Sequence, residues 1–232
     1  MDRELSSQAV LDCVVEHWAE QSLHFRYANA LQEALQETID CTSALATSNA
    51  SLTAMPELCC RAVADLLTEG ITQVTAAWLL YYTAARLLDA VADNKAFSPD
   101  LGVTINLAAG LIVSAGELLC RLPDAASSEA IREMFADAVL AMCSGQHLAL
   151  VSATMPLQMC WRLAELRSGV FFAAAAWAGA RLGTLDETRL TLLKRYGHEL
   201  GMLLQIGDDL KDLWPRDGYR SDLAVAGWHL PV

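Results

Sequence analysis

Acidic residues at two places in this chain have the spacing of divalent metal ligands. Asp208, Asp209 and Asp212 lie in "LLQIGDDLKDLW", directly after a run of apolar residues. Residues four apart share a helix face, so Asp208 and Asp212 project together, while Asp209 lies about 100° around the axis. Asp89 and Asp93 form a second same-face pair in "YYTAARLLDAVADN". Because these acids interrupt apolar helices and repel one another, they require a compensating cation.

The chemistry that these carboxylates favour is the binding of a diphosphate through Mg²⁺. Two acidic helix ends that face each other across a cavity hold Mg²⁺ with hard oxygen ligands, and water and phosphate complete the shell. The metal ions would cancel the charge of the leaving diphosphate, and an allylic carbocation would remain in an apolar chamber. For Asp89 and Asp93 taken alone, a solvated helix end is an equally good explanation. The interpretation therefore depends on the later cluster.

Gln205, Gly201 and Gly197 continue the stripe of Asp208 toward the start of the same helix. Glycines at this spacing let another helix approach closely, and the amide of Gln205 is placed to reach a ligand above the aspartates. We therefore expect a neighbouring helix against this stripe.

The elements that position these residues are predicted to be helices throughout. Periodicity favours helices over 4–24, 28–45, 57–68, 71–94, 104–121, 128–152, 156–182 and 185–214. Pro56 suits a first helical turn, Gly70 separates two helices, and Thr184 with Glu187 has a capping-box pattern. No repeat or linker divides the chain, which predicts one all-α domain over 1–232.

The composition fits a compact helical protein, with 54% hydrophobic and 19% charged residues. A net charge of −12 lacks the basic footprint of nucleic-acid binding, so we expect no nucleic-acid partner. No apolar stretch is long enough to suggest a membrane span, and "MDRELSSQAV" has no signal core. Seven scattered cysteines favour buried thiols in a reducing cytoplasm. The final "GWHLPV" resembles the start of another apolar helix, as expected for a chain truncated at its C-terminus.

Four segments resemble the motifs of trans-prenyl diphosphate synthases, in the expected order. "YGHELGMLLQIGDDLKD" resembles the second aspartate-rich motif, and "LLDAVADN" resembles the first with Ala90 in place of its middle aspartate. "SGQHLAL" is similar to the G-Q helix, and "LRSGVFFAAAAWAGA" to the K-T-G-x-F segment with Arg167 and Ser168 substituted. The resemblance runs from about residue 57 to the end.

This resemblance implies the class I isoprenoid synthase fold, a helical bundle with a central apolar cavity, acting as a homodimer in the cytoplasm. It implies three Mg²⁺ ions and a linear prenyl diphosphate substrate. The implied catalytic residues are Asp89, Asp93, Asp208, Asp209 and Asp212, of which Asp89, Asp93, Asp208 and Asp212 hold metal. The implied substrate-binding residues are Tyr82, Ala85, Arg86, Gln146, Arg167, Ser168, Phe172 and Gln205.

The departures from the motifs concern the second substrate. Chain-elongating members carry G-G-K-x-x-R-P before the first motif and R-R-G after it, which hold isopentenyl diphosphate. This chain has "TAMPELCCR" and "NKAFSPD" there, and Gly227 where a lysine is expected. An enzyme that ionises one preformed prenyl diphosphate, a terpene synthase, is therefore expected first. The alternatives are a prenyl diphosphate synthase that uses isopentenyl diphosphate and a non-catalytic subunit of a heteromeric synthase.

Small residues before the first motif bear on substrate length. Ala84 and Ala85 stand where bulky aromatic side chains close the pocket in short-chain members. They predict a deep pocket and a substrate of diterpene size or longer, unless Tyr82 and Trp78 cap it.

Overall fold

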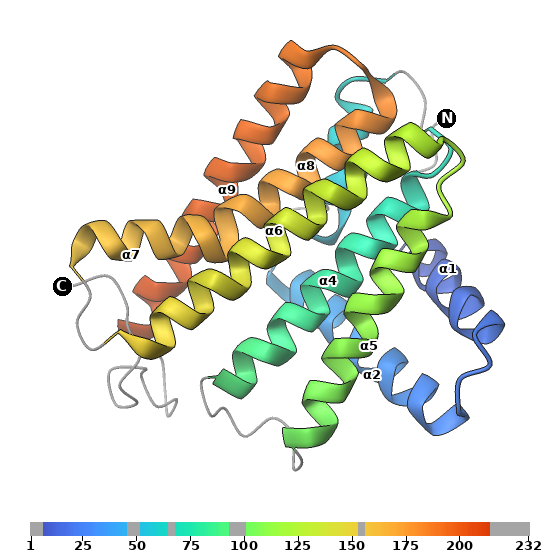
Figure 1. Ribbon diagram of the computed structural model, residues 1–232, viewed down its shortest axis with the longest axis horizontal. Helices are drawn as coiled ribbons and strands as arrows, with labels where there is room; N and C mark the ends of the chain where they lie inside the picture. The colour runs from blue at the N-terminus through green and yellow to red at the C-terminus, as the bar shows by residue number, and fades with distance from the viewer. Residues whose placement is uncertain (1–6, 46–51, 65–67, 93–100, 153–155, 214–232) are drawn as a thin grey trace.

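The protein is described by a computed structural model that covers residues 7–45, 52–64, 68–92, 101–152 and 156–213, without the side chains of 43–45 and 211–213. These residues form helices and no strand, which confirms the all-α fold (Figure 1). In chain order the elements are α1 (Ser7–Glu20), α2 (Phe25–Leu45), η1 (Leu52–Ala54), α3 (Met55–Arg61), α4 (Ile71–Ala92), α5 (Leu101–Cys120), α6 (Ala125–Val151), α7 (Leu157–Ala164), η2 (Glu165–Gly169), α8 (Val170–Gly183) and α9 (Glu187–Leu213).

Helix α3, which precedes the link to α4, is shorter than predicted. Pro56 lies in the first turn of α3, as predicted, but the helix ends at Arg61 rather than at residue 68. Gly70 has a φ of 92°, a conformation that L side chains rarely adopt, and α4 begins at the next residue. The positive φ explains why the chain breaks here.

The single helix expected over 156–182 is interrupted by η2, a π-helical turn between α7 and α8. A π turn inserts one extra residue into an α-helix, and such turns are frequent at functional sites. It carries Arg167 and Ser168. Helical periodicity alone does not reveal it, because the apolar pattern continues on both sides.

The start of α9 differs from the predicted capping box. Asp186 Oδ1 accepts hydrogen bonds from the backbone N–H of Thr188 at 2.9 Å and of Arg189 at 3.4 Å. Thr184 Oγ1 instead accepts from the N–H of Asp186 at 3.1 Å. Asp186 therefore caps the helix, and the box predicted from Thr184 and Glu187 is wrong.

Helix α8 is the centre of the bundle. It lies between α6 and α9 and also contacts α3, as Figure 1 shows for its orange ribbon. Residues 171–176 are all buried, so this helix is enclosed on nearly every side. At Gly179 an added Cβ would lie 1.9 Å from the carbonyl oxygen of Pro56, so α3 lies directly against α8 there. This close packing fixes η2, at the other end of α8, relative to the core.

Two helices in the described part of the chain are long and apolar enough to cross a membrane by length and composition, contrary to the expectation from sequence. They are Leu101–Cys120 and Ala125–Val151, with 39% and 17% of their most apolar windows buried. Core helices of globular proteins pass the same test, so the observation is weak evidence for a span. Both helices belong to the bundle, where α5 packs against α4 and α6 packs against α8.

Candidate active site

Asp89 lies near the C-terminal end of α4, where it forms an ion pair with η2. One Nη atom of Arg167 donates to Asp89 Oδ1 at 2.5 Å. The arginine side chain is 21% exposed and the aspartate 43%. The structure thus brings together two residues that are 78 apart in sequence, and a cation of the chain itself lies on the first predicted metal ligand.

The next residue of η2 connects to the second acidic cluster. Ser168 Oγ donates to Gln205 Oε1 at 2.7 Å, and Gln205 Nε2 donates to Asp209 Oδ1 at 3.0 Å. Asp209 is half-buried and Asp208 is exposed. Of two consecutive residues of the π turn, Arg167 therefore binds a carboxylate of α4 directly, and Ser168 is linked to a carboxylate of α9 through Gln205.

The glycine stripe of α9 allows this approach, as the sequence predicts. A Cβ at Gly201 would lie 2.6 Å from the carbonyl oxygen of Ser168, and one at Gly197 would lie 2.4 Å from that of Phe172. Real Cβ atoms do not approach other atoms so closely, so only glycine lets α9 lie against η2 and α8 here. Gln205 reaches Ser168 because of this contact.

Arg86 and Tyr82 lie on the face of α4 that leads away from Asp89 into the bundle. Burial raises the pKa of Tyr82; the charge of Arg86 lowers it, and Asp208 and Cys41 raise it. The Nη1 atom of Arg86 is buried and has no hydrogen-bond partner in the described structure.

Aromatic rings fill the bundle beneath Asp89. The ring centroids of Trp78 and Phe171 are 4.3 Å apart, and those of Trp78 and Phe172 are 5.1 Å apart. Tyr82 joins this aromatic cluster, with centroids 5.7 Å from Trp78 and 6.4 Å from Phe172. Ala84 is buried and Ala85 half-buried on the same helix. Tyr82 and Trp78, the residues that could cap the expected deep pocket, both belong to this cluster, and the depth of the pocket stays a prediction.

The predicted metal ligands lie only partly within the described residues. No group of three His, Cys, Asp or Glu side chains close enough to hold a metal ion occurs among the described residues. Asp93 lies outside the described residues; Asp212 belongs to the helix α9, but its side chain is outside them too. Asp89, Asp208 and Asp209 provide hard oxygen donors on the two joined helix ends, which is the chemistry that Mg²⁺ requires. The donor chemistry of the described residues therefore fits a Mg²⁺ site.

Gln146 lies at the level of η2 but outside the hydrogen-bonded chain. A Cβ at the preceding Gly145 would lie 2.8 Å from Leu166 Cβ and 3.3 Å from Arg167 Cγ, so α6 touches η2 here. Gln146 itself is half-buried and makes no hydrogen bond to the carboxylates within the described ranges. Its predicted substrate contact stays a prediction.

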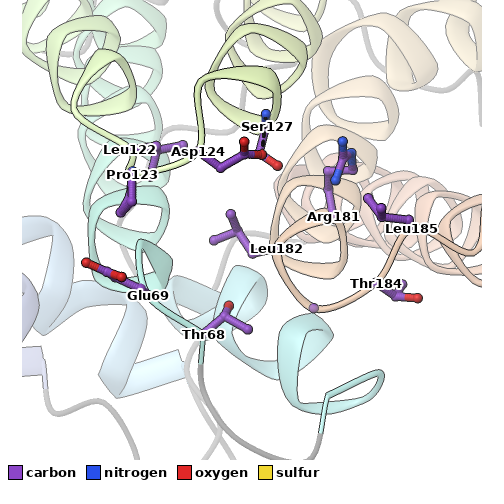
Figure 2. A pocket seen from close by; sticks show the side chains of 11 residues that line it. Thr68, Glu69, Leu122, Pro123, Asp124, Ser127, Arg181, Leu182, Thr184 and Leu185 are labelled. Carbon is purple, nitrogen blue, oxygen red and sulfur yellow. Dashed lines mark hydrogen bonds between the residues drawn. The ribbon is translucent and has the colours of Figure 1, made fainter.

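A cavity of about 570 Å³ lies elsewhere, and Figure 2 shows the side chains around it. It is lined by residues in or next to the links that join α3 to α4, α5 to α6 and α8 to α9, including Glu69 and Asp124 of the first two links and Arg181 near the end of α8. Because α4 starts beside this cavity and carries Asp89 near its other end, the two sites lie at opposite ends of the bundle. None of the residues predicted for catalysis or binding lines it.

Two features of the site depend on the packing of distant helices. The ion pair between Arg167 and Asp89 depends on how α8 packs, and the proximity of Cys41 to Tyr82 depends on how α2 lies beside α4. The substitution of Arg167 in an otherwise matching segment was the available hint for the first. For Cys41 no local pattern existed.

The chain is similar to prenyl synthases in sequence and in fold. A family model described as polyprenyl synthetase matches residues 90–218, more than half of the 232 residues. No curated protein matches the chain in sequence.

Solved structures agree in fold. A geranylgeranyl pyrophosphate synthetase from Pyrococcus horikoshii is similar, with a TM-score of 0.76 and 18% identity over 97% of this chain and 71% of that one. A geranyltransferase from Legionella pneumophila has a TM-score of 0.70 and 18% identity over 92% of this chain and 79% of its own. A geranyltransferase from Helicobacter pylori, in complex with magnesium and isoprenyl diphosphate, has a TM-score of 0.70 and 16% identity over 98% of this chain and 84% of its own. This chain belongs to the polyprenyl synthetase family.

Proposed function

We propose that this protein is a Mg²⁺-dependent prenyl diphosphate synthase, which joins an allylic prenyl diphosphate to isopentenyl diphosphate. The observation that carries the proposal is the pair of contacts from η2, which hold Asp89 of α4 and the Gln205–Asp209 pair of α9 at one site. The family match and the three prenyl synthase structures of the same fold support the elongation reaction over the cyclisation expected first.

In this proposal the aspartates and Arg167 bind the diphosphate, and the aromatic cluster binds the hydrocarbon tail. Asp89, Asp208 and Asp209, with Asp93 and Asp212, would hold Mg²⁺, which neutralises the diphosphate and assists its departure. Arg167 is placed to donate to the phosphate oxygens once it leaves Asp89, because guanidinium forms bidentate pairs with phosphate. The hydrocarbon tail would lie toward the rings of Trp78, Tyr82 and Phe172, whose π faces stabilise positive charge and whose packing excludes water.

The reaction in this proposal breaks the bond between the allylic carbon and its diphosphate oxygen, and the electron pair leaves with the diphosphate. The double bond of isopentenyl diphosphate supplies the electrons of the new carbon–carbon bond, and a proton is lost to a base in the site. The products are a longer prenyl diphosphate and free diphosphate.

We further propose that the protein acts as a soluble cytoplasmic homodimer.

A terpene synthase remains the second candidate because of one specific observation. The basic residue of "TAMPELCCR", Arg61, pairs with Glu57 at 2.9 Å within α3. The cations that hold isopentenyl diphosphate in elongating enzymes are therefore missing from that segment. "NKAFSPD" lies outside the described residues.

The test is to incubate the purified protein with Mg²⁺ and a length series of all-trans allylic diphosphates, with and without isopentenyl diphosphate. Mass spectrometry of diphosphates and hydrocarbons then separates the candidates. Longer diphosphates that form only with isopentenyl diphosphate support the proposal. Hydrocarbons or alcohols that form regardless of it would establish a terpene synthase instead, and no turnover until a partner chain is added would establish a non-catalytic subunit.

Two double variants test the assignment of the metal ligands. The double substitution Asp208→Ala with Asp209→Ala should abolish diphosphate release, because both acids lie on the α9 side of the site. Glu133→Ala with Asp137→Ala is the matched control, since these two exposed acids of α6 remove the same charge elsewhere. Near-normal turnover in the first double variant would contradict the assignment.

A further inference from the structure

A small polar cavity is lined by residues of α1, α2, η1, α3 and α4, far from the proposed active site. Its volume is about 30 Å³, and a buried water molecule needs roughly 10–15 Å³. Ser7, Thr53, Glu57 and Thr75 bring side-chain oxygen atoms to the lining, and its other residues are apolar. Thr75 precedes Asp89 by fourteen residues, which is about 21 Å along a helix at 1.5 Å per residue. The cavity is therefore separate from the carboxylates assigned to the substrate.

Thr75 is a buried residue whose hydroxyl lacks a partner within the described part of the chain. The residue is 3% exposed, and its Oγ1 atom is enclosed without a hydrogen-bond partner. A threonine inside a helix can satisfy its hydroxyl on the carbonyl four residues earlier, as Thr83 of the same helix does on Leu79 at 2.9 Å. Thr75 makes no such bond. Because an enclosed hydroxyl without a partner is destabilising, this position requires a partner that enters from outside the chain.

Glu57 brings a buried carboxylate to the same cavity. It is 4% exposed, and its Oε1 atom accepts from Arg61 Nε at 2.9 Å. A carboxylate has about four acceptor positions, so the bond from Arg61 does not exhaust them. Since Arg61 already compensates the negative charge, a further cation would bring an unpaired charge into the interior, which is costly. The cavity therefore favours a small neutral molecule that both donates and accepts hydrogen bonds.

We propose that this cavity binds a resident water molecule, which bridges Thr75 of α4 and Glu57 of α3. The water accepts from the Thr75 hydroxyl and donates to the carboxylate, and the hydroxyl of Thr53 lines the same space as a third partner. Helix α3 also lies against α8 at Gly179. The bridge therefore joins α4, which carries Asp89, through α3 to the central helix of the bundle. This inference does not depend on which reaction the protein catalyses.

Three variants test the water site: Thr75→Val, Thr75→Ser and the control Thr83→Val. Thr83 is buried in the same helix, but its hydroxyl is bonded to Leu79, so the control makes the same change away from the cavity. Magnetic relaxation dispersion of water oxygen-17 counts the long-lived internal waters of each protein. Thr75→Val should lose one internal water relative to wild type, while Thr75→Ser and Thr83→Val should retain it. The Tm of Thr75→Val should fall by about 2–4 °C, the shift expected for one lost hydrogen bond in a protein of this size.

A dry cavity predicts the opposite signs. Thr75→Val would then remove an unbonded hydroxyl at nearly constant shape, so its Tm would rise and the relaxation dispersion would equal that of wild type. Either result overturns the proposal. A crystal structure of the wild-type protein gives a test that needs no variant: water density within hydrogen-bond distance of Thr75 Oγ1 and the Glu57 carboxylate supports the bridge, and its absence overturns it. A wild-type Tm that rises with K⁺ but not with tetramethylammonium at equal ionic strength would assign the cavity to a cation instead.

Discussion

At the scale of single residues, the ion pair between Arg167 and Asp89 is the feature with the most direct consequence. A carboxylate that accepts from an arginine at 2.5 Å must give up that partner, or share it, before it can bind a metal ion. Without substrate, the arginine and a divalent cation therefore compete for Asp89. With diphosphate present, the same arginine gains a new anion, so the competition is relieved.

Replacing Arg167 by glutamine should strengthen the binding of Mn²⁺ to the protein without diphosphate. The expected gain is about two- to fivefold, the size of a partly exposed ion pair worth about 0.4–1 kcal/mol. Electron paramagnetic resonance of free Mn²⁺ measures it directly. Arg162→Gln serves as the control because it removes an arginine whose partner, Glu165, is not a predicted metal ligand. Weaker Mn²⁺ binding in Arg167→Gln than in wild type would show that the two cations do not compete.

At the scale of elements, the contact between α9 and η2 requires a residue without a Cβ atom at position 201. Gly201→Ala should destabilise the protein by about 1–3 kcal/mol, because its Cβ would lie 2.6 Å from the carbonyl oxygen of Ser168. Gly207→Ala is the matched control in the same helix, since a Cβ there meets nothing within 4 Å. It should stabilise the protein by up to about 1 kcal/mol through helix propensity. Urea unfolding measures the change in the free energy of unfolding for each variant, which should be negative for Gly201→Ala and positive for Gly207→Ala. Equal changes in both variants would contradict the packing argument.

The inner face of α4 should control the length of the product. Tyr82→Ala removes a ring from the aromatic cluster with Trp78 and Phe172, and so opens the space beneath Asp89. We expect longer products, resolved by chromatography of the dephosphorylated alcohols. Tyr81→Ala is the control on the adjacent residue, whose ring stacks on Phe135 of α6 at 5.3 Å instead. A shift of equal size in both variants would indicate a general loosening of the helix rather than a deeper pocket.

The elements also show which parts of the site can be predicted from sequence. The glycine stripe at Gly197 and Gly201, the turn at Gly70 and the existence of the helices follow from local patterns, because spacing alone determines which residues share a face. The π turn at Glu165–Gly169 could not be predicted, since one extra residue in a continuous apolar pattern changes no local propensity. The cap at Asp186 competed with an equally plausible capping residue two positions earlier, Thr184. Contacts such as Arg167 with Asp89 require the packing of distant helices.

At the scale of the whole molecule, α5 and α6 leave apolar side chains exposed. Val113 of α5 is 62% exposed and Leu140 of α6 is 69% exposed, on two helices that pack against each other. If the proposed homodimer forms, these exposed apolar side chains are where we expect its interface.

Leu140→Glu should shift the protein from dimer to monomer without unfolding it, because the side chain is exposed in the single chain and a charge at an interface must be desolvated. Sedimentation velocity at micromolar concentration measures the change. Leu192→Glu is the control, an equally exposed leucine (62%) on α9. A wild-type protein that sediments as a monomer would contradict the homodimer and leave this surface for another partner.

The π turn also limits how this protein can tolerate changes of length. An α-helix advances by about 100° per residue, so deleting one residue within 165–169 would restore an uninterrupted α-helix and turn α7 by about that angle relative to α8. Cys160 and Leu163, which are now buried, would turn toward solvent. Arg167 would no longer face Asp89. The extra residue shifts the helical phase between α7 and α8. Because of this shift, the buried face of α7 packs on the bundle while Arg167 in the turn faces Asp89.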